Sequence, residues 1–175
     1  MENNTIKSLS TFYSDCVVDY HTEAAKMGVA TKGTIFIPEL IPYGERILLT
    51  FLRDPVIEME FSDPRTYYYA IMSFGIQSGI VFAAKWHEDF SGLDEQFDMV
   101  SALGPSFYAN DLLEKHFPSD ISRDQGNTFY YMIFERLEEE HKPYWQLRDP
   151  RQYTFKALLA AYQLGVSMML EKLGY

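Results

Sequence analysis

The sequence predicts an all-α protein, a helical bundle built from two pseudo-symmetric repeats of about three helices each. Two observations support this fold class. Apolar residues make up 47% of the 175 residues, and they recur largely at the three- and four-residue spacing of buried helix faces. The stretch DPRTYYYAIMSFGIQSGI, from Asp63 to Ile80, also returns in altered form as DPRQYTFKALLAAYQLGV, from Asp149 to Val166.

The two copies match at an offset of 86 residues, which is close to half the chain. The identical pairs are Asp63 and Asp149, Pro64 and Pro150, Arg65 and Arg151, Tyr67 and Tyr153, Gln77 and Gln163, and Gly79 and Gly165. An internal duplication explains such a match. We therefore expect residues 1–175 to form a single compact domain with internal repeats at approximately 1–89 and 90–175.

Each copy begins with the residues that start a helix. Asp63 and Asp149 are good N-caps, because a short carboxylate accepts hydrogen bonds from the free amides of the first turn. A proline follows each of them, at the position where a missing N–H costs nothing. We expect helices from about Pro64 to Trp86 and from about Pro150 to Lys172.

Small residues recur within both predicted helices. Gly79 lies four residues after Gly75, and Gly165 lies four residues after Ala161. Residues at that spacing share one helix face, and small ones let a second backbone approach closely. The two helices are therefore predicted to cross at Gly79 and Gly165, related by a pseudo-twofold axis.

The first of these helices also has the length of a membrane span. No charged residue occurs from Thr66 to Ala84. The run contains three consecutive tyrosines, and the second copy carries Lys156 in its interior. These polar groups favour a buried core helix over a membrane span.

Arg65 and Arg151 fall in the first helical turn, where the helix dipole disfavours a cation. We expect a carboxylate from the other repeat or from a neighbouring helix to compensate. The functional alternative is that both arginines reach for a shared anion, although no glycine-rich phosphate loop precedes either copy.

The rest of the chain is also predicted to be mainly helical. Further helices are expected at about 5–27, 44–53, 108–117 and 128–141, and from an N-cap at Ser91 to Leu103. Inward-facing residues would be Phe12, Cys16, Val17, Tyr20 and Ala24 in the first, and Met132, Phe134 and Leu137 in the helix at 128–141. Pro38 and Pro42 exclude a regular helix near 29–43, so a short extended segment is expected there. The runs Thr34–Ile37 and Val56–Phe61 are β-prone.

Charge and cysteine content limit the possible partners. The chain has 25 acidic and 15 basic residues and a net charge of −10. This charge opposes direct binding to nucleic acid, and it favours a partner protein with a basic surface. A lone cysteine excludes an intramolecular disulfide and fits a reducing compartment, and the N-terminus lacks the pattern of a secretory signal. We expect a cytoplasmic protein.

Two groups of residues are candidates for chemistry. Glu138 and His141 form the ExxH pair of di-iron helix bundles, but the second pair that such a site needs is absent, and solvated charge at a helix end explains both residues. Cys16 shares a helix face with Asp19, whereas His21 points elsewhere, so a nucleophile would lack its base. We expect a buried structural cysteine, no metal, no cofactor and no catalytic site.

Aromatic residues form 16% of the chain, and Tyr and Trp are favoured anchors of protein interfaces. Acidic runs at 88–98 and 135–140 could rim such an interface. The alternative is an aromatic core with solvated charged faces. The candidate interface or pocket residues are Tyr67, Gln77, Tyr153, Gln163, Tyr144, Trp145, Arg65 and Arg151.

These observations favour a non-catalytic acidic helical protein that binds a basic protein surface, as an inhibitor or regulator of a nucleic-acid-binding protein. In charge and size the chain is similar to small inhibitors encoded by phages, such as anti-CRISPR proteins, with no shared motif. The alternative is a small-ligand-binding protein or enzyme with a pocket between the two helical repeats. Tyr67, Tyr153, Gln77 and Gln163 would line that pocket.

Overall fold

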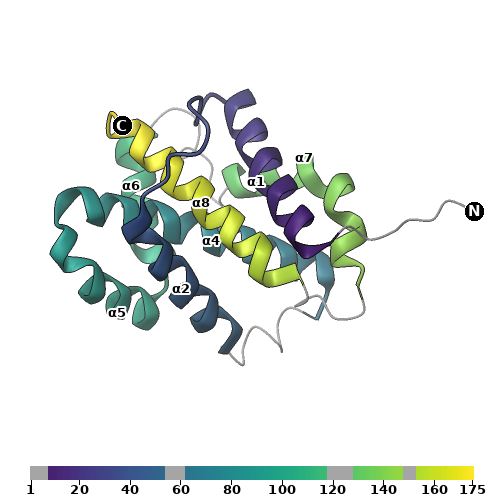
Figure 1. The fold of residues 1–175 in the computed structure, drawn as a ribbon, viewed down its shortest axis with the longest axis horizontal. Helices are drawn as coiled ribbons and strands as arrows, with labels where there is room; N and C mark the ends of the chain where they lie inside the picture. Colours follow the sequence, from purple (N-terminus) through teal and green to yellow (C-terminus); the bar gives the residue numbers. More distant parts are fainter. Residues whose placement is uncertain (1–7, 54–61, 118–127, 148–152) are drawn as a thin grey trace, which may run out of the picture.

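The computed structural model describes residues 8–53, 62–117, 128–147 and 153–175, and 84% of these residues are helical. The described α-helices are α1 (Leu9–Lys26), α2 (Ile41–Arg53), α4 (Pro64–Glu88), α5 (Leu93–Leu103), α6 (Ser106–His116), α7 (Thr128–Trp145) and α8 (Thr154–Lys172) (Figure 1). Two short 3-10 turns, η1 (Pro38–Leu40) and η2 (Phe90–Gly92), precede α2 and α5. Within the described ranges, every helix is too short or too polar to traverse a lipid bilayer. The predicted all-α bundle is confirmed.

Helices α4 and α8 form the centre of the bundle and run side by side in the same direction (Figure 1). The hydroxyl of Tyr67, near the start of α4, lies 2.9 Å from the hydroxyl of Thr154, at the start of α8. Further along, Gly79 of α4 faces Gly165 of α8. The start of α4 is as predicted, because the Asp63 carboxylate accepts a hydrogen bond of 3.0 Å from the Thr66 amide.

The two central helices are in contact backbone to backbone at these glycines. A β-carbon on Gly79 would lie 2.7 Å from the Val166 nitrogen and would strike the Tyr162 carbonyl oxygen. A β-carbon on Gly165 would lie 3.1 Å from the Gly79 Cα and would strike the Ile76 carbonyl oxygen. No side chain fits at either position without moving a backbone. The helices therefore meet at Gly79 and Gly165, as the sequence predicted.

In the part of the chain that the structure describes, five helices surround this pair. Helix α1 packs on α8 and on α7, and α7 packs on α4. Helix α2 contacts both central helices, while α5 and α6 pack on α4. The inward residues predicted for α1 are confirmed, since Phe12, Cys16, Tyr20 and Ala24 are at most 1% exposed and Val17 packs against the core.

The segment at 29–43 is only partly extended. Residues 29–37 are not helical, but η1 follows at once and α2 begins at Ile41, so the exclusion of a helix around Pro42 is wrong. Pro42 lies in the first turn of α2, where its missing N–H costs nothing. The described residues contain no strand at Thr34–Ile37. The β-prone run Val56–Phe61 lies outside the described residues.

Two helix boundaries also differ from the prediction. Ser91 is not an N-cap, because its amide donates to the Asp89 carboxylate in η2 and α5 begins two residues later, after Gly92. Helix α7 continues past His141 to Trp145, through Pro143. A proline near a helix C-terminus removes one hydrogen bond, and here the Gln146 amide still donates to the Lys142 carbonyl.

The repeat itself is described only in part. Asp149, Pro150 and Arg151, which would start the second copy, lie outside the described residues, and α8 is described from Thr154. On α7, Met132 was predicted to face inward but is 38% exposed, while the adjacent Ile133 is buried. One residue rotates a helix by about 100°, so an error of one position in the inward stripe has this effect.

Candidate functional site

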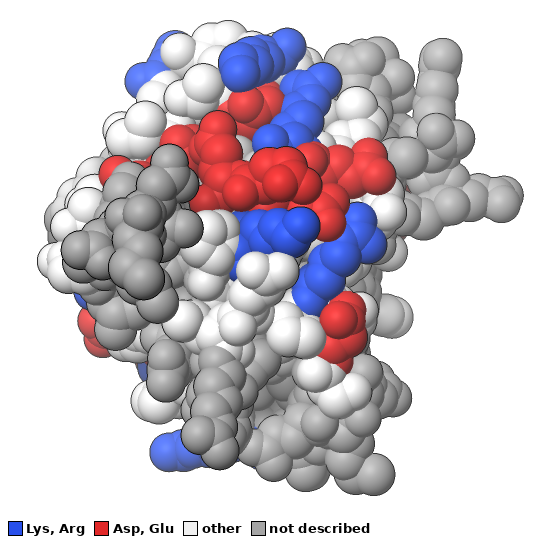
Figure 2. All heavy atoms as spheres, turned by 90° about the vertical axis from the view of Figure 1, so that its right-hand side faces the viewer, with Lys and Arg blue, Asp and Glu red and all other residues white. Residues whose placement is uncertain are grey.

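Charge is concentrated on the face that α1 and α7 form together. These two helices carry seven carboxylate side chains and three Lys or Arg side chains. The carboxylates are Asp15, Asp19, Glu23, Glu135, Glu138, Glu139 and Glu140, and we call this surface the acidic face. Figure 2 shows a band of acidic side chains on the side of the molecule where α1 and α7 lie, with basic side chains along both flanks.

Some of these carboxylates are already paired with cations. Glu138 accepts two hydrogen bonds from Arg65, at 2.8 and 3.2 Å, and Glu23 lies 3.6 Å from Arg136. Glu135, Glu139 and Glu140 are exposed, and none of the described lysines or arginines forms an ion pair with them. Their negative charge is available to a partner.

Beneath the acidic face lies a buried histidine, His141, which is only 2% exposed. Its Nε2 lies 3.1 Å from Oδ2 of Asp19, and its Nδ1 lies 2.5 Å from the hydroxyl of Tyr68. The Tyr68 hydroxyl lies 2.8 Å from that of Tyr20. A continuous row of hydrogen bonds thus runs from the half-buried Asp19 carboxylate into the core.

One arrangement of the hydrogens in this row satisfies each of its groups. Burial raises the pKa of both Tyr20 and Tyr68, so both phenols keep their protons. With Tyr68 donating to Nδ1, a neutral His141 carries its proton on Nε2 and donates it to Asp19. The expectation that solvated charge at a helix end explains His141 is therefore wrong, because the imidazole is an integral part of the core.

Glu140 extends the group at the surface. One ligand atom each from Asp19, Glu140 and His141 lies within 4.8 Å of the other two. The two carboxylates come from different helices and the imidazole comes from beneath them. This is the one group of three or more such side chains found among the described residues.

Cys16 lies beside the same histidine, with its Sγ 3.7 Å from Nδ1 of His141. The thiol is completely buried, and its burial and then the negative charges of Asp19 and Asp15 raise its pKa well above the ordinary value. A neutral thiol is a poor nucleophile, so the contact with His141 does not activate it. The prediction that Cys16 is buried is confirmed.

Three of the predicted interface or pocket residues lie inside the bundle. Tyr67, Tyr153 and Gln77 are at most 4% exposed. The Tyr153 hydroxyl donates to the Pro64 carbonyl at 3.5 Å, and the Gln77 side-chain oxygen accepts a hydrogen bond of 2.7 Å from the Ser106 hydroxyl. These residues therefore connect helices to one another, and the structure does not place them on a surface or in a pocket.

Tyr144 and Trp145 are also buried, at 9% and 3% exposure. The ring of Tyr144 stacks on Phe12 with centroids 3.9 Å apart, and Trp145 stacks on Phe134 at 5.2 Å. Neither aromatic side chain is available to a partner in this conformation. For these residues the structure supports the alternative of an aromatic core beneath charged faces.

The prediction that a carboxylate compensates for the charge is confirmed for Arg65. The Arg65 guanidinium pairs with Glu138 of α7 and lies 5.1 Å from the centre of the Phe134 ring. A carboxylate of a neighbouring helix therefore compensates for its unfavourable place in the first turn of α4. Arg151 lies outside the described residues, so its pairing with Arg65 around an anion is not seen.

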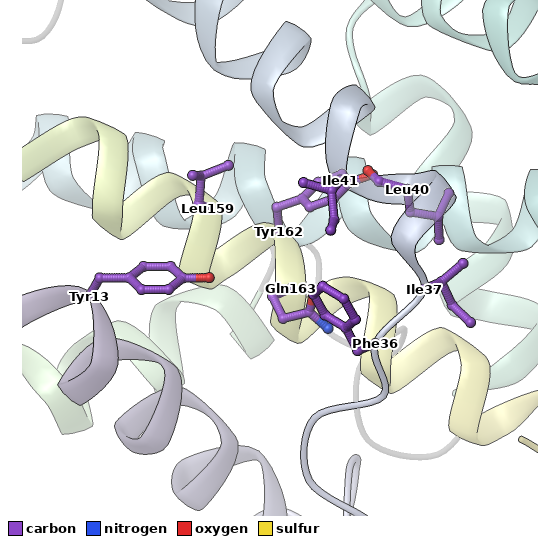
Figure 3. A pocket seen from close by; sticks show the side chains of 8 residues that line it. All are labelled: Tyr13, Phe36, Ile37, Leu40, Ile41, Leu159, Tyr162 and Gln163. Carbon is purple, nitrogen blue, oxygen red and sulfur yellow. The ribbon is translucent and has the colours of Figure 1, made fainter. Parts of the chain in front are cut away.

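Among the predicted residues that the structure describes, Gln163 lines a pocket. Eight residues from α1, the 36–41 segment and α8 line this pocket, which has a volume of about 90 Å³. They are Tyr13, Phe36, Ile37, Leu40, Ile41, Leu159, Tyr162 and Gln163 (Figure 3). The Gln163 amide donates to the Ile35 carbonyl at 2.8 Å, and the Tyr162 hydroxyl donates to the Leu40 carbonyl at 2.7 Å. The polar groups of α8 thus hold the backbone at Ile35 and Leu40 in place, and the open part of the pocket is apolar.

Sequence reasoning missed the group around His141, although a signal was present. His141 lies four residues after Leu137 and seven after Phe134, a spacing that places all three on one helix face. Since Phe134 and Leu137 were predicted to face inward, His141 belonged to the buried stripe. Its partners Asp19 and Tyr68 come from distant parts of the chain, which no local pattern reveals.

Comparison with protein-family models, with curated proteins and with solved structures finds no match to this chain.

Proposed function

We propose that this chain is a non-catalytic binding protein whose acidic face docks onto a basic surface of another protein. The observation that carries the proposal is the excess of carboxylates on α1 and α7, seven against three cations. Two packed helices present these charges from a fixed frame. A charged patch of this kind raises the rate of encounter with an oppositely charged partner and disfavours like-charged ones.

The outer row of α7 is the natural contact surface. Glu135 and Glu139 are exposed and four residues apart, so they project from the same side of the helix. Arg65 and Arg136 at the flanks are occupied by Glu138 and Glu23. The unpaired carboxylates therefore dominate the potential that an approaching protein meets.

The partner we favour is a protein whose basic surface normally holds nucleic acid, which this chain would inhibit or regulate. Such surfaces use Lys and Arg side chains to bind phosphates, and carboxylates are complementary to the same side chains. The overall charge of −10 supports this choice, because a chain this acidic repels nucleic acid and does not bind it directly. A cytoplasmic location belongs to the same proposal.

The test is affinity capture from the native cell with three forms of the full chain, followed by mass spectrometry. The variant Glu135→Gln/Glu139→Gln removes two charges from the acidic face. The control Glu95→Gln/Asp98→Asn removes two exposed charges from α5. We expect wild type and control to recover the same basic protein and the α7 variant to lose it. Equal recovery by all three forms would exclude the acidic face as the docking surface.

The second candidate function is binding of a small apolar ligand in the pocket of Figure 3. Phe36 and Ile41 border this pocket and are 59% and 38% exposed, so its apolar lining is open to solvent. A volume of about 90 Å³ suits a group no larger than a single ring. Binding of an apolar solvatochromic dye to wild type, but not to Leu159→Trp, which fills the pocket, would support this candidate.

The duplication of the chain also remains a proposal. Its support is a reciprocal contact: Gly79 meets the carbonyl of Tyr162, and Gly165 meets the carbonyl of Ile76, which precedes Tyr162 by the repeat offset. The tyrosines follow the same pattern, since each of Tyr67 and Tyr153 reaches the start of the opposite helix. An experimental structure in which Asp149 caps α8 as Asp63 caps α4 would support the two-repeat architecture.

A further inference from the structure

His141 presents a nitrogen to two carboxylates at the edge of the core. Its Nε2 points toward Asp19, and Glu140 brings a third ligand atom within 4.8 Å. From this geometry we infer a binding site for a divalent first-row transition ion, with Nε2 of His141, the Asp19 carboxylate and the Glu140 carboxylate as ligands. This inference goes beyond the docking function, because it assigns a different ligand to different residues of the acidic face.

The imidazole is held as a metal-binding histidine usually is. Ligating histidines almost always bond their second ring nitrogen to a protein group, which fixes the ring orientation. Here Nδ1 of His141 is held by the Tyr68 hydroxyl, which is held in turn by Tyr20. The ring is also 98% buried, since its exposure is 2%. Only Nε2 is directed toward the surface carboxylates.

The ligand atoms are close to a coordinating arrangement. Zn²⁺ binds nitrogen and carboxylate oxygen at about 2.0–2.2 Å, so tetrahedral ligands lie roughly 3.3–3.5 Å apart. The Nε2 of His141 and Oδ2 of Asp19 are already 3.1 Å apart. Glu140 is exposed, and a change of its side-chain rotamer brings its oxygen in. The fourth position faces solvent and takes a water molecule.

Coordination requires the hydrogens of the buried row to reverse direction. A metal on Nε2 needs its lone pair, so the proton of neutral His141 moves to Nδ1 and is donated to the Tyr68 oxygen. Tyr68 then donates to Tyr20, and either hydroxyl of that pair can be the donor. The imidazole remains neutral and the chain of contacts is preserved, with the bond to Asp19 replaced by the metal.

The donor set selects the type of ion. One imidazole nitrogen with two carboxylate oxygens suits Zn²⁺ and its first-row neighbours, whereas Mg²⁺ and Ca²⁺ prefer oxygen ligands alone. Two carboxylates balance the ion's charge. They belong to the acidic face, whose remaining carboxylates favour cation entry.

The test is calorimetric titration of the full chain with ZnCl₂ after treatment with a chelator and its removal. We expect one equivalent to bind. Asp19→Asn and Glu140→Gln should each weaken binding by about tenfold or more, because each removes a charged ligand. The matched control is Glu139→Gln, an exposed neighbour on the same helix, which should bind as wild type does. Circular dichroism confirms that each variant retains its helices.

A second variant tests the buried support. Tyr68→Phe keeps the ring and removes the hydroxyl that holds Nδ1, so we expect zinc affinity to fall about 10–100-fold. With Co²⁺ as the probe, wild type should show the visible absorption of a low-coordinate site, and Asp19→Asn should lose it. The inference is overturned if wild type binds less than one equivalent, or if Asp19→Asn and Glu140→Gln bind as wild type does. Glu135→Gln/Glu139→Gln should retain zinc, so loss of the docking function is distinguishable from loss of the metal site.

Discussion

The α4–α8 contact and the α1–α7 contact differ in the groups that lie between the two helices. At Gly79 and Gly165 the backbones touch, and no side chain separates them. Where α1 and α7 meet, the ring of Phe12 stacks on that of Tyr144. Beside this stack, His141 of α7 lies between Asp19 of α1 and Tyr68 of α4. The first contact leaves no room for a side chain, whereas the second includes a buried row of hydrogen-bonding groups.

This difference suits the two contacts to different roles, one to the stability of the fold and the other to binding. A contact without side chains leaves nothing for a ligand to recognise, and it loses most when a single carbon is added. A contact built from a histidine and carboxylates at the edge of the core adds less apolar burial but offers charges and lone pairs to a partner. We therefore place the stability of the fold in α4 and α8 and the proposed binding chemistry on α1 and α7.

The largest expected effect is at the central glycines. Gly79→Leu and Gly165→Leu each force a side chain against the backbone of the opposite helix, which should cost roughly 3 kcal/mol or more. For a chain of this size the melting temperature should fall by roughly 6–12 °C. Thermal unfolding followed by circular dichroism measures the shift.

Two further substitutions make the glycine result specific. Ala25→Leu adds similar bulk at an exposed position of α1 and should change the melting temperature little. Gly79→Ala should not raise the melting temperature, although alanine is the better helix former by about 1 kcal/mol. A stabilised Gly79→Ala, together with a harmless Gly165→Leu, would show that the two helices do not depend on this contact.

Removal of the buried imidazole should have the next largest effect. His141→Ala leaves a cavity and leaves the Tyr68 hydroxyl without its ring-nitrogen partner, at a cost of about 2–3 kcal/mol. Urea denaturation would measure this loss. Lys142→Ala, at the exposed neighbouring position, is the control and should lie within about 0.5 kcal/mol of wild type. Equal stability of the two variants would mean that His141 is not part of the core.

A smaller effect is expected at the start of α4. Asp63→Ala removes the N-cap of the Thr66 amide and should destabilise the protein by about 1 kcal/mol at neutral pH. Hydrogen bonds from the Thr66 amide and hydroxyl lower the pKa of Asp63 below its ordinary value. The carboxylate's contribution is therefore complete above the unfolded-state pKa of about 4 and is lost as the pH falls through the lowered folded-state pKa.

The pH dependence gives this prediction its check. The gap in melting temperature between wild type and Asp63→Ala should be constant from pH 7 to about pH 5 and should shrink below about pH 4. A gap that widens on acidification would contradict the assignment of the charged carboxylate as the cap.

The smallest effect should come from the acidic face. Glu135 and Glu139 are like charges four residues apart, a pair that destabilises a helix by about 0.2–0.5 kcal/mol. Glu135→Gln/Glu139→Gln should therefore raise the melting temperature slightly or leave it unchanged. A marked fall would show that these carboxylates maintain the fold and are not reserved for a partner.

The sequence predicted the first of the two contacts far better than the second. Helix starts and close backbone approach follow from local patterns, so Asp63, Gly79 and Gly165 were predicted correctly. The polar contact joins residues 48 to 125 positions apart, and only tertiary packing brings Cys16, Tyr68 and His141 together.

The candidate site residues that were predicted wrongly are buried in the structure. Tyr and Trp are common at interfaces, and this predicted an interface or pocket role for Tyr67, Tyr153, Tyr144 and Trp145. The same rings fill a core equally well. Composition does not distinguish the two uses. A complete inward stripe for α7 would have included His141 and changed the expectation that it is solvated.

Native-state hydrogen exchange tests the division between the two regions most directly. The amides of α4 and α8 around Gly79 and Gly165 should exchange only through global unfolding, with the largest opening free energies in the molecule. Those of α7 around Glu139 should exchange through local opening at a lower free energy. Amides of α7 as protected as those beside Gly79 would contradict the separation of a stability centre from a binding face.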